Sequence, residues 1–250
     1  MSRSTKMKNL AAISVAAVMG VAVQSAFAHT GPRDKAVEGV SAYNAIAIGH
    51  TCEIPGTETS RPIIAQSVVF PTVNPHVYRA DNLKPMNLEN VIEQGSLVDL
   101  PQLIQDKSIF TKQDEKTNTD GQVIGFYGAY GNLQHNLRGI VPFRMGAVNF
   151  VPDSCAKTLL VNIAIADICT RVFPPKPGTA NLWIPNTTPK FSDPAIDGIG
   201  KPATLAISRD LVANPLKASC GAGYEVVVSP SDQDIDQNLK IRNYWPGTGL

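Results

Sequence analysis

The sequence has few aromatic residues and few charges of either sign. Aromatic residues make up 6% of the chain and charged residues 17%, and its 22 Lys and Arg residues nearly balance 21 Asp and Glu residues. A nucleic-acid-binding domain presents a basic face, so this balance argues against a nucleic-acid partner. The low aromatic content also leaves no obvious platform on which sugars could stack.

Common enzyme motifs are missing as well. The chain contains no G-x-S-x-G, no H-E-x-x-H and no P-loop. The glycine-rich stretch Gly125–Gly131 has no following lysine and no phosphate-loop spacing. Its alternation of glycine with aromatic residues instead predicts a strand and turn packed tightly against a neighbour. We therefore expect a protein that is not an enzyme.

The four cysteines contain no C-x-x-C pair, which disfavours a zinc knuckle or a thioredoxin-type site. An even number of cysteines in an exported chain predicts two disulfides. Cys52, Cys155, Cys169 and Cys220 allow three pairings, and the sequence does not choose among them.

Long apolar runs are confined to the start of the chain. Three basic residues precede the run Leu10–Val23, which is short for a membrane span of about 20 residues. The small-x-small sequence Ala26–Ala28 follows, so residues 1–28 are predicted to be a secretory signal peptide. The alternative, an uncleaved anchor helix, lacks a stop-transfer flank. We expect residues 29–250 to form a single periplasmic or extracellular domain with no membrane span.

The pattern after residue 28 predicts an all-β fold, a disulfide-containing β-sandwich. Short Val- and Ile-rich runs separated by turn residues are typical of such folds. The expected strands are Tyr43–Ile48, Ile63–Phe70, Val123–Tyr127, Ala147–Val151, Thr158–Ala166, Thr204–Ser208 and Tyr224–Ser229.

Three other segments differ from this strand pattern. Broken helical spacing over Asn87–Asp106 predicts a short helical insert of one or two helices. The polar stretch Lys107–Gln122 is expected to be a surface loop. Pro174–Pro202 contains seven prolines and predicts a proline-rich extended loop.

Signal cleavage after Ala28 would make His29 the first residue of the mature chain. Its α-amine, with a reference pKa of about 7.7–8.0, and its ring Nδ1 can then chelate one metal ion, an arrangement called a histidine brace. Nitrogen-rich tetragonal sites favour copper, Cu2+. The alternative is that His29 is simply a loose chain end.

Further candidate ligands follow the first expected strand. His50, Cys52 and Glu53 offer nitrogen, sulfur and oxygen close together, although a disulfide is favoured for Cys52. His50 and Glu53 remain candidates both as ligands and as ordinary surface or packing residues. His76 and His135 lie in polar turns, where surface histidines are the usual occupants. For Trp183 and Trp245, core or edge packing is favoured over a role beside a metal.

Residues 29–71 resemble the YcnI-like periplasmic copper-binding domain. The similar features are a histidine after the cleavage point, the sequence Ile48–Cys52 and the strand with its proline turn, Arg61–Pro71. The resemblance implies a β-sandwich that binds Cu(II) through its first histidine, with a glutamate and a nearby tryptophan. No tryptophan follows the second strand here, so that role is not transferred, and Glu38 and Glu53 are both candidates for the glutamate.

Together these features predict a protein that stores, delivers or senses copper through His29, His50 and Glu53. Its expected partners are the copper ion and another copper-handling protein. Two alternatives stay open: an exported structural or interaction sandwich without metal, and a copper-dependent oxidase with a second histidine from His50, His76 or His135.

Overall fold

The computed structural model describes residues 29–245. The predicted signal peptide, residues 1–28, lies outside this part of the chain. Within it, no helix is long and apolar enough to cross a membrane.

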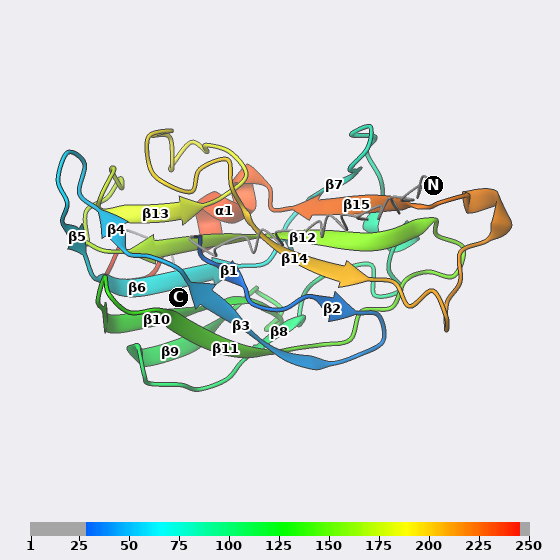
Figure 1. Cartoon of the computed structure of the whole chain (residues 1–250), viewed down its shortest axis with the longest axis horizontal. Helices are drawn as coiled ribbons and strands as arrows, with labels where there is room; N and C mark the ends of the chain where they lie inside the picture. The colour runs from blue at the N-terminus through cyan, green and yellow to red at the C-terminus, as the bar shows by residue number, and fades with distance from the viewer. Residues whose placement is uncertain (1–28, 246–250) are drawn as a thin grey trace, which may run out of the picture.

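The chain folds into β-strands with very little helix (Figure 1). The helical elements are the 3-10 turns η1 (Leu88–Asn90) and η2 (Ala218–Cys220) and one α-helix, α1 (Asp232–Asn238). The strands are β1 (Gly31–Pro32), β2 (Ala36–Val37), β3 (Ala42–Ile48), β4 (Cys52–Glu53), β5 (Ser60–Arg61), β6 (Ile63–Val69), β7 (His76–Arg79), β8 (Pro101–Leu103), β9 (Phe110–Thr117), β10 (Val123–Leu133), β11 (Gly139–Met145), β12 (Ala156–Ile168), β13 (Ala180–Trp183), β14 (Ala203–Ser208) and β15 (Tyr224–Ser229).

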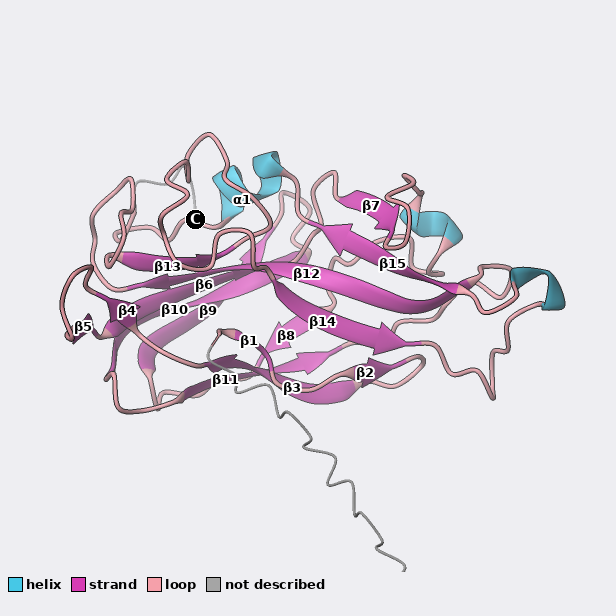
Figure 2. Cartoon of the chain, turned by 45° about the horizontal axis from the view of Figure 1, so that its top comes forward, coloured by secondary structure: helices cyan, strands magenta, loops and turns pink. Residues whose placement is uncertain are grey.

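Two sheets face each other as the layers of a β-sandwich, the fold class that the sequence predicts (Figure 2). The smaller sheet has the order β1-β3-β11-β8. The larger sheet runs β2-β14-β12-β6-β10-β9, with β13 and β15 also paired to β12 and β7 paired to β15. The small ladder β4-β5 stands apart from both. The core between the layers contains buried side chains from both sheets, among them Ile46, Ile48, Phe143, Val68, Phe126, Val161 and Ile165.

The larger sheet buries its other face too. Alternate residues of β6, β12 and β13 pack in a second apolar cluster beneath α1 and the chain that follows it. This cluster contains Trp245, whose ring lies against Phe173 and Phe191, so the packing role predicted for Trp245 is confirmed. Because β12 is covered on both faces, it is apolar almost throughout, as buried strands are.

Six of the seven predicted strands are present, and two disulfides form as expected. The pairs are Cys52–Cys169 and Cys155–Cys220, a choice that the sequence left open. The glycine-rich stretch is part of β10 and packs tightly. A Cβ on Gly128 would lie 2.3 Å from Cδ2 of Phe110 on the neighbouring strand β9, a separation that only glycine permits.

The seventh prediction, a strand over Ala147–Val151, is wrong. Only Phe150 makes an isolated bridge there, to Ile92. Its backbone N–H donates instead to Oε1 of Glu38 at 2.7 Å, so it cannot extend a ladder. The strand that precedes this segment, β11, was not predicted.

Three segments predicted as non-strand contain strands. The expected loop Lys107–Gln122 contains β9, a polar strand at the end of the larger sheet; charged side chains are usual on such strands. The predicted helical insert is reduced to the turn η1, because the chain takes left-handed backbone at Gly95 (φ 62°) and Asp99 (φ 59°) and then enters strand β8. The proline-rich segment is mostly loop, as predicted, but contains β13.

A buried lysine connects β9 to the C-terminal helix. Nζ of Lys116 donates to the carbonyl oxygens of Asn238 and, at 3.0 Å, of Lys240. Burial lowers the pKa of Lys116 from 10.5 to about 7, although nearby Asp234 acts in the opposite direction. Between these two pKa values the unfolded chain holds more protons at this position than the folded chain does.

The lysine therefore makes the free energy of unfolding rise with pH between about 7 and 10.5. We expect the wild type to gain stability over this window relative to Lys116→Met, by up to about 1.4 kcal/mol per pH unit. Urea unfolding of both proteins at several pH values measures the difference. A pH-independent difference between them would contradict this account.

Candidate functional site

The pairing of β1 with β3 brings His29 to His50. The strands are antiparallel, with Gly31 opposite Ala47. In an antiparallel pair the residue numbers run in opposite directions. His29, two residues before Gly31, therefore lies beside the chain that follows the end of β3 at Ile48. The centroids of the His29 and His50 rings lie 6.5 Å apart.

Trp183 of the larger sheet completes this group of rings. Its indole centroid is 5.0 Å from that of His29 and 5.6 Å from that of His50. The tryptophan is fully buried, at the end of β13, so the packing role predicted for it is confirmed. Its ring also contacts both imidazoles, with interplanar angles of 57° to His29 and 79° to His50, a position that its sequence context did not indicate.

A buried carboxylate, that of Asp167, is hydrogen-bonded to this tryptophan. Asp167 accepts hydrogen bonds at Oδ2 from Thr30 Oγ1 (2.6 Å) and Trp183 Nε1 (2.8 Å), and at Oδ1 from Gln66 Nε2 (2.7 Å). Burial raises the pKa of Asp167, and these three hydrogen bonds and the nearby His50 oppose that rise. The chain thus holds a polar group, fully out of solvent, directly behind its histidine pair.

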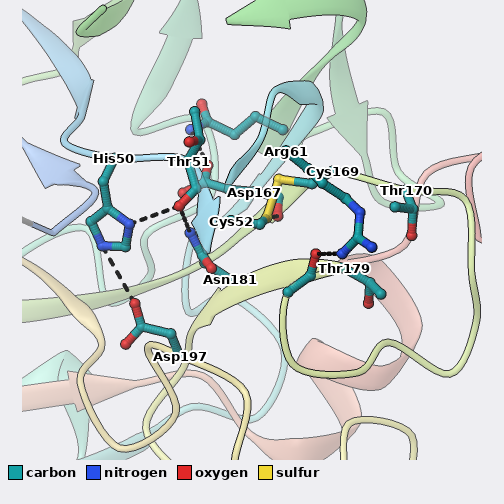
Figure 3. Close-up of a disulfide and its surroundings, with 12 residues drawn as sticks. His50, Thr51, Cys52, Arg61, Asp167, Cys169, Thr170, Thr179, Asn181 and Asp197 are labelled. Atoms are coloured by element: carbon teal, nitrogen blue, oxygen red, sulfur yellow. Dashed lines mark hydrogen bonds and ion pairs between the residues drawn. A yellow bond between two sulfur atoms is a disulfide. The ribbon is translucent and has the colours of Figure 1, made fainter. Parts of the chain in front are cut away.

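The hydrogen bonds of His50 set the role of each ring nitrogen (Figure 3). Nδ1 lies 2.9 Å from the carbonyl oxygen of Thr51, which can only accept, so Nδ1 carries a proton. Nε2 lies 3.4 Å from Oδ2 of Asp197. This is how metal-binding histidines are commonly held: one nitrogen donates to a carbonyl, and the other is left to take a proton or a metal ion.

The disulfide Cys52–Cys169 fixes the segment that carries His50 (Figure 3). It connects β4 to the chain just after β12, and the Thr51 carbonyl also accepts from Nδ2 of Asn181 at 3.3 Å. Since Cys52 is bonded to Cys169, its sulfur is not a metal donor, as favoured from the sequence.

The other candidate residues lie apart from the histidine pair. Glu53 is exposed on β4 and shares a surface hollow with Asn181 and Asp197. The carboxylate of Glu38 accepts from the backbone of Phe150 and Asp210, in a different part of the fold. Two other histidines are exposed, one on β7 (His76) and one in a turn (His135).

No group of three or more His, Cys, Asp or Glu side chains suited to a metal ion occurs among residues 29–245. Glu53 therefore does not form such a group with His29 and His50. The donors that the site can offer are two imidazoles and, if the chain begins at His29, its α-amine.

The spacing of the rings suits this donor set. A metal–nitrogen bond of about 2.0 Å places an ion roughly 3.2 Å from the centre of an imidazole, so the centres of two rings on opposite sides of one ion lie about 6.4 Å apart. The separation of 6.5 Å between His29 and His50 is close to that value.

Sequence reasoning missed three residues at this site, Thr30, Asp167 and Asp197, and favoured packing over a place beside a metal for Trp183. One signal was present, because Asp167 ends a run of apolar residues in β12 and an acid at such a position needs a partner inside the fold. Trp183 and Asp197 lie in the proline-rich segment, where no local pattern indicates which side chains turn inward.

Comparisons with known proteins give only a remote likeness. No family model and no curated protein matches the sequence. Among solved structures, the chain is similar to an uncharacterized protein from Nocardia farcinica with an immunoglobulin-like fold, at 12% identity and a TM-score of 0.41, over 72% of this chain and 99% of that one.

Proposed function

We propose that the exported form of this protein binds one Cu(II) ion at its N-terminus, for storage, delivery or sensing of copper. The α-amine and ring of His29 and Nε2 of His50 would be its nitrogen ligands. The observation that carries the proposal is the pair of imidazoles, 6.5 Å apart, in contact with Trp183. A copper ion there would act as cargo or signal, since the chain has no enzyme motif.

The surroundings of the two rings favour a cation. The carboxylate of Asp197 lies 3.4 Å from Nε2 of His50. Glu53 shares the hollow with Asp197, apart from the two rings, and adds to the negative charge there without being counted among the ligands.

The resemblance of residues 29–71 to the YcnI-like copper-binding domain supports the same function. It implies a tryptophan close to the first histidine, and the local sequence offers none. Trp183, far away in the chain, has its ring centroid 5.0 Å from that of His29 and is the tryptophan that we propose for this role. The two disulfides suit a protein that works in an oxidising compartment, the periplasm or the extracellular space.

The test is a Cu(II) titration of protein that begins at His29, in competition with a chelator of known affinity. His50→Ala is expected to weaken binding by roughly 100-fold, since loss of a direct ligand should cost at least as much as loss of an outer-shell partner. His76→Ala and His135→Ala, each removing an exposed histidine elsewhere, should bind as the wild type does. Glu53→Gln is expected to have a smaller effect than His50→Ala.

The titration also separates the alternatives. Equal weakening by all three histidine variants, or no stoichiometric binding by the wild type, would contradict the site and favour an exported interaction domain without metal. Tight binding together with reductant-dependent peroxide production would instead favour a copper-dependent oxidase.

A further inference from the structure

The second residue of the expected mature chain is held by its side chain. Thr30 is 2% exposed, and its hydroxyl donates to Oδ2 of Asp167 at 2.6 Å. The same oxygen accepts from Nε1 of Trp183 at 2.8 Å. One carboxylate oxygen therefore fixes both the neighbour of His29 and the ring that His29 contacts.

We propose that Asp167 is the positioning residue of the N-terminal site: it holds Thr30 and Trp183 together and so places His29 beside His50. This inference rests on the proposed function and deepens it. Asp167 itself does not reach the ion in this account. It acts through its two hydrogen-bond donors, each of which contacts or adjoins His29.

The chemistry of Asp167 supports a role of this kind. The carboxylate is fully buried, and all three of its hydrogen-bond partners are neutral groups. Burying a carboxylate without a cationic partner is costly, and an apolar residue of similar size is usually at least as stable. Stability alone therefore gives no reason for an acid here.

The third partner, Gln66, strengthens the point. Its Nε2 donates to Asp167, while its buried Oε1 has no hydrogen-bond partner among residues 29–245. Gln66 and Asp167 lie directly opposite each other on β6 and β12. The Gln66 amide thus binds Oδ1 of Asp167 at the cost of leaving its own oxygen without a partner. The other carboxylate oxygen, Oδ2, is then free to accept from Thr30 and Trp183.

The expected consequence is that a chain end, which is usually mobile, starts from a fixed position. With Thr30 anchored, only the bonds of a single residue separate the α-amine of His29 from a rigid point. Pre-ordering a ligand reduces the entropy lost when the ion binds. Removing the Thr30 hydroxyl should therefore weaken metal binding without removing any ligand.

The experiment compares three single variants of the protein that begins at His29. Thr30→Val removes the hydroxyl and keeps the shape, and Thr30→Ser keeps the hydroxyl. Thr188→Val is the matched control, because buried Thr188 donates to Asp236 at the same 2.6 Å in another part of the fold.

Two readouts are needed, one without metal and one with Cu(II). Without metal, nuclear Overhauser contacts between the His29 and Trp183 rings should persist in the wild type, Thr30→Ser and Thr188→Val and disappear in Thr30→Val. With Cu(II), Thr30→Val should bind roughly 10-fold more weakly and change the copper paramagnetic resonance spectrum, as outer-shell variants of metal sites do. A fourth variant, Asp167→Leu, removes the acceptor oxygen that Thr30 and Trp183 share and should reproduce both effects.

The outcomes separate this inference from the proposed function. Ring contacts and copper affinity unchanged in Thr30→Val would overturn the positioning role and leave copper binding intact. Equal losses in Thr30→Val and Thr188→Val would also overturn it, since they would reflect general destabilisation. A wild type that keeps the ring contacts but binds no Cu(II) would refute the proposed function alone.

Discussion

Adding four residues in front of His29 is expected to abolish tight Cu(II) binding, with an affinity loss of roughly 100-fold or more. The extension converts the α-amine of His29, which ionises near neutral pH, into a peptide nitrogen, and it moves the new α-amine out of chelating reach of the His29 ring. The His29 ring remains, but it no longer shares a chelate with a free amine. Competition with a chelator of known affinity measures the loss.

The fold should be unaffected by this change. Thr30 is anchored on Asp167 by its side chain, which an extension does not alter. The extended protein should therefore unfold at the same denaturant concentration as the wild type. A version whose four extra residues can be removed by a specific protease provides the control, and their removal should restore the affinity. Tight binding by the extended protein would mean that the α-amine is not a ligand.

Removing the disulfide Cys52–Cys169 should have the second-largest effect, acting on stability and on copper together. The two cysteines are 117 residues apart, and loss of a disulfide that closes a long loop typically costs about 2–5 kcal/mol. The bond also fixes the segment whose Thr51 carbonyl orients His50. We expect the double variant Cys52→Ser/Cys169→Ser to be less stable and to bind copper at least about 10-fold more weakly.

The second disulfide is the matched control. Cys155 and Cys220 are 65 residues apart and connect the start of β12 to the loop before β15. The double variant Cys155→Ser/Cys220→Ser should lose stability of the same order and keep the copper affinity of the wild type. Unfolding curves and Cu(II) titrations of both variants make the comparison. Equal copper losses would show that the first disulfide has no special connection with the site.

The strands that sequence reasoning found are those with apolar residues along most of their length. β12 is buried on both faces and β6 on nearly all of its length, so each appears as a continuous Val-, Ile- and Ala-rich run. β9 was missed because it lies at the end of the sheet and is polar at seven of its eight positions, from Thr111 to Thr117. Its buried lysine, Lys116, finds partners only in the C-terminal segment, far away in the sequence.

The helical prediction failed for a different reason. The apolar residues of Asn87–Asp106 do reach the core, as Val91, Ile92 and Leu97 show. Helical spacing reports which residues are buried, and a series of turns can bury the same residues. Left-handed backbone at Gly95 and the pairing of β8 with β11 decide the outcome, and the second of these depends on a strand 40 residues later.

At the candidate site, local sequence was informative about the histidines and silent about their support. His29 and His50 were found from the cleavage pattern and from a strand end, and the register of β1 on β3 brings them together. Trp183 and Asp167 reach the site only through the packing of the larger sheet against the smaller one. Such contacts leave no trace in the spacing of residues along a single segment.

The central claim is that the mature protein starts at His29 and holds one Cu(II) there. The most direct measurement is intact mass spectrometry of the exported protein, first denatured and then under native conditions with one equivalent of Cu(II). The account predicts a mass that begins at His29, two disulfides and one copper ion retained after desalting. A mature chain that begins at another residue, or copper lost on gentle desalting, would contradict it.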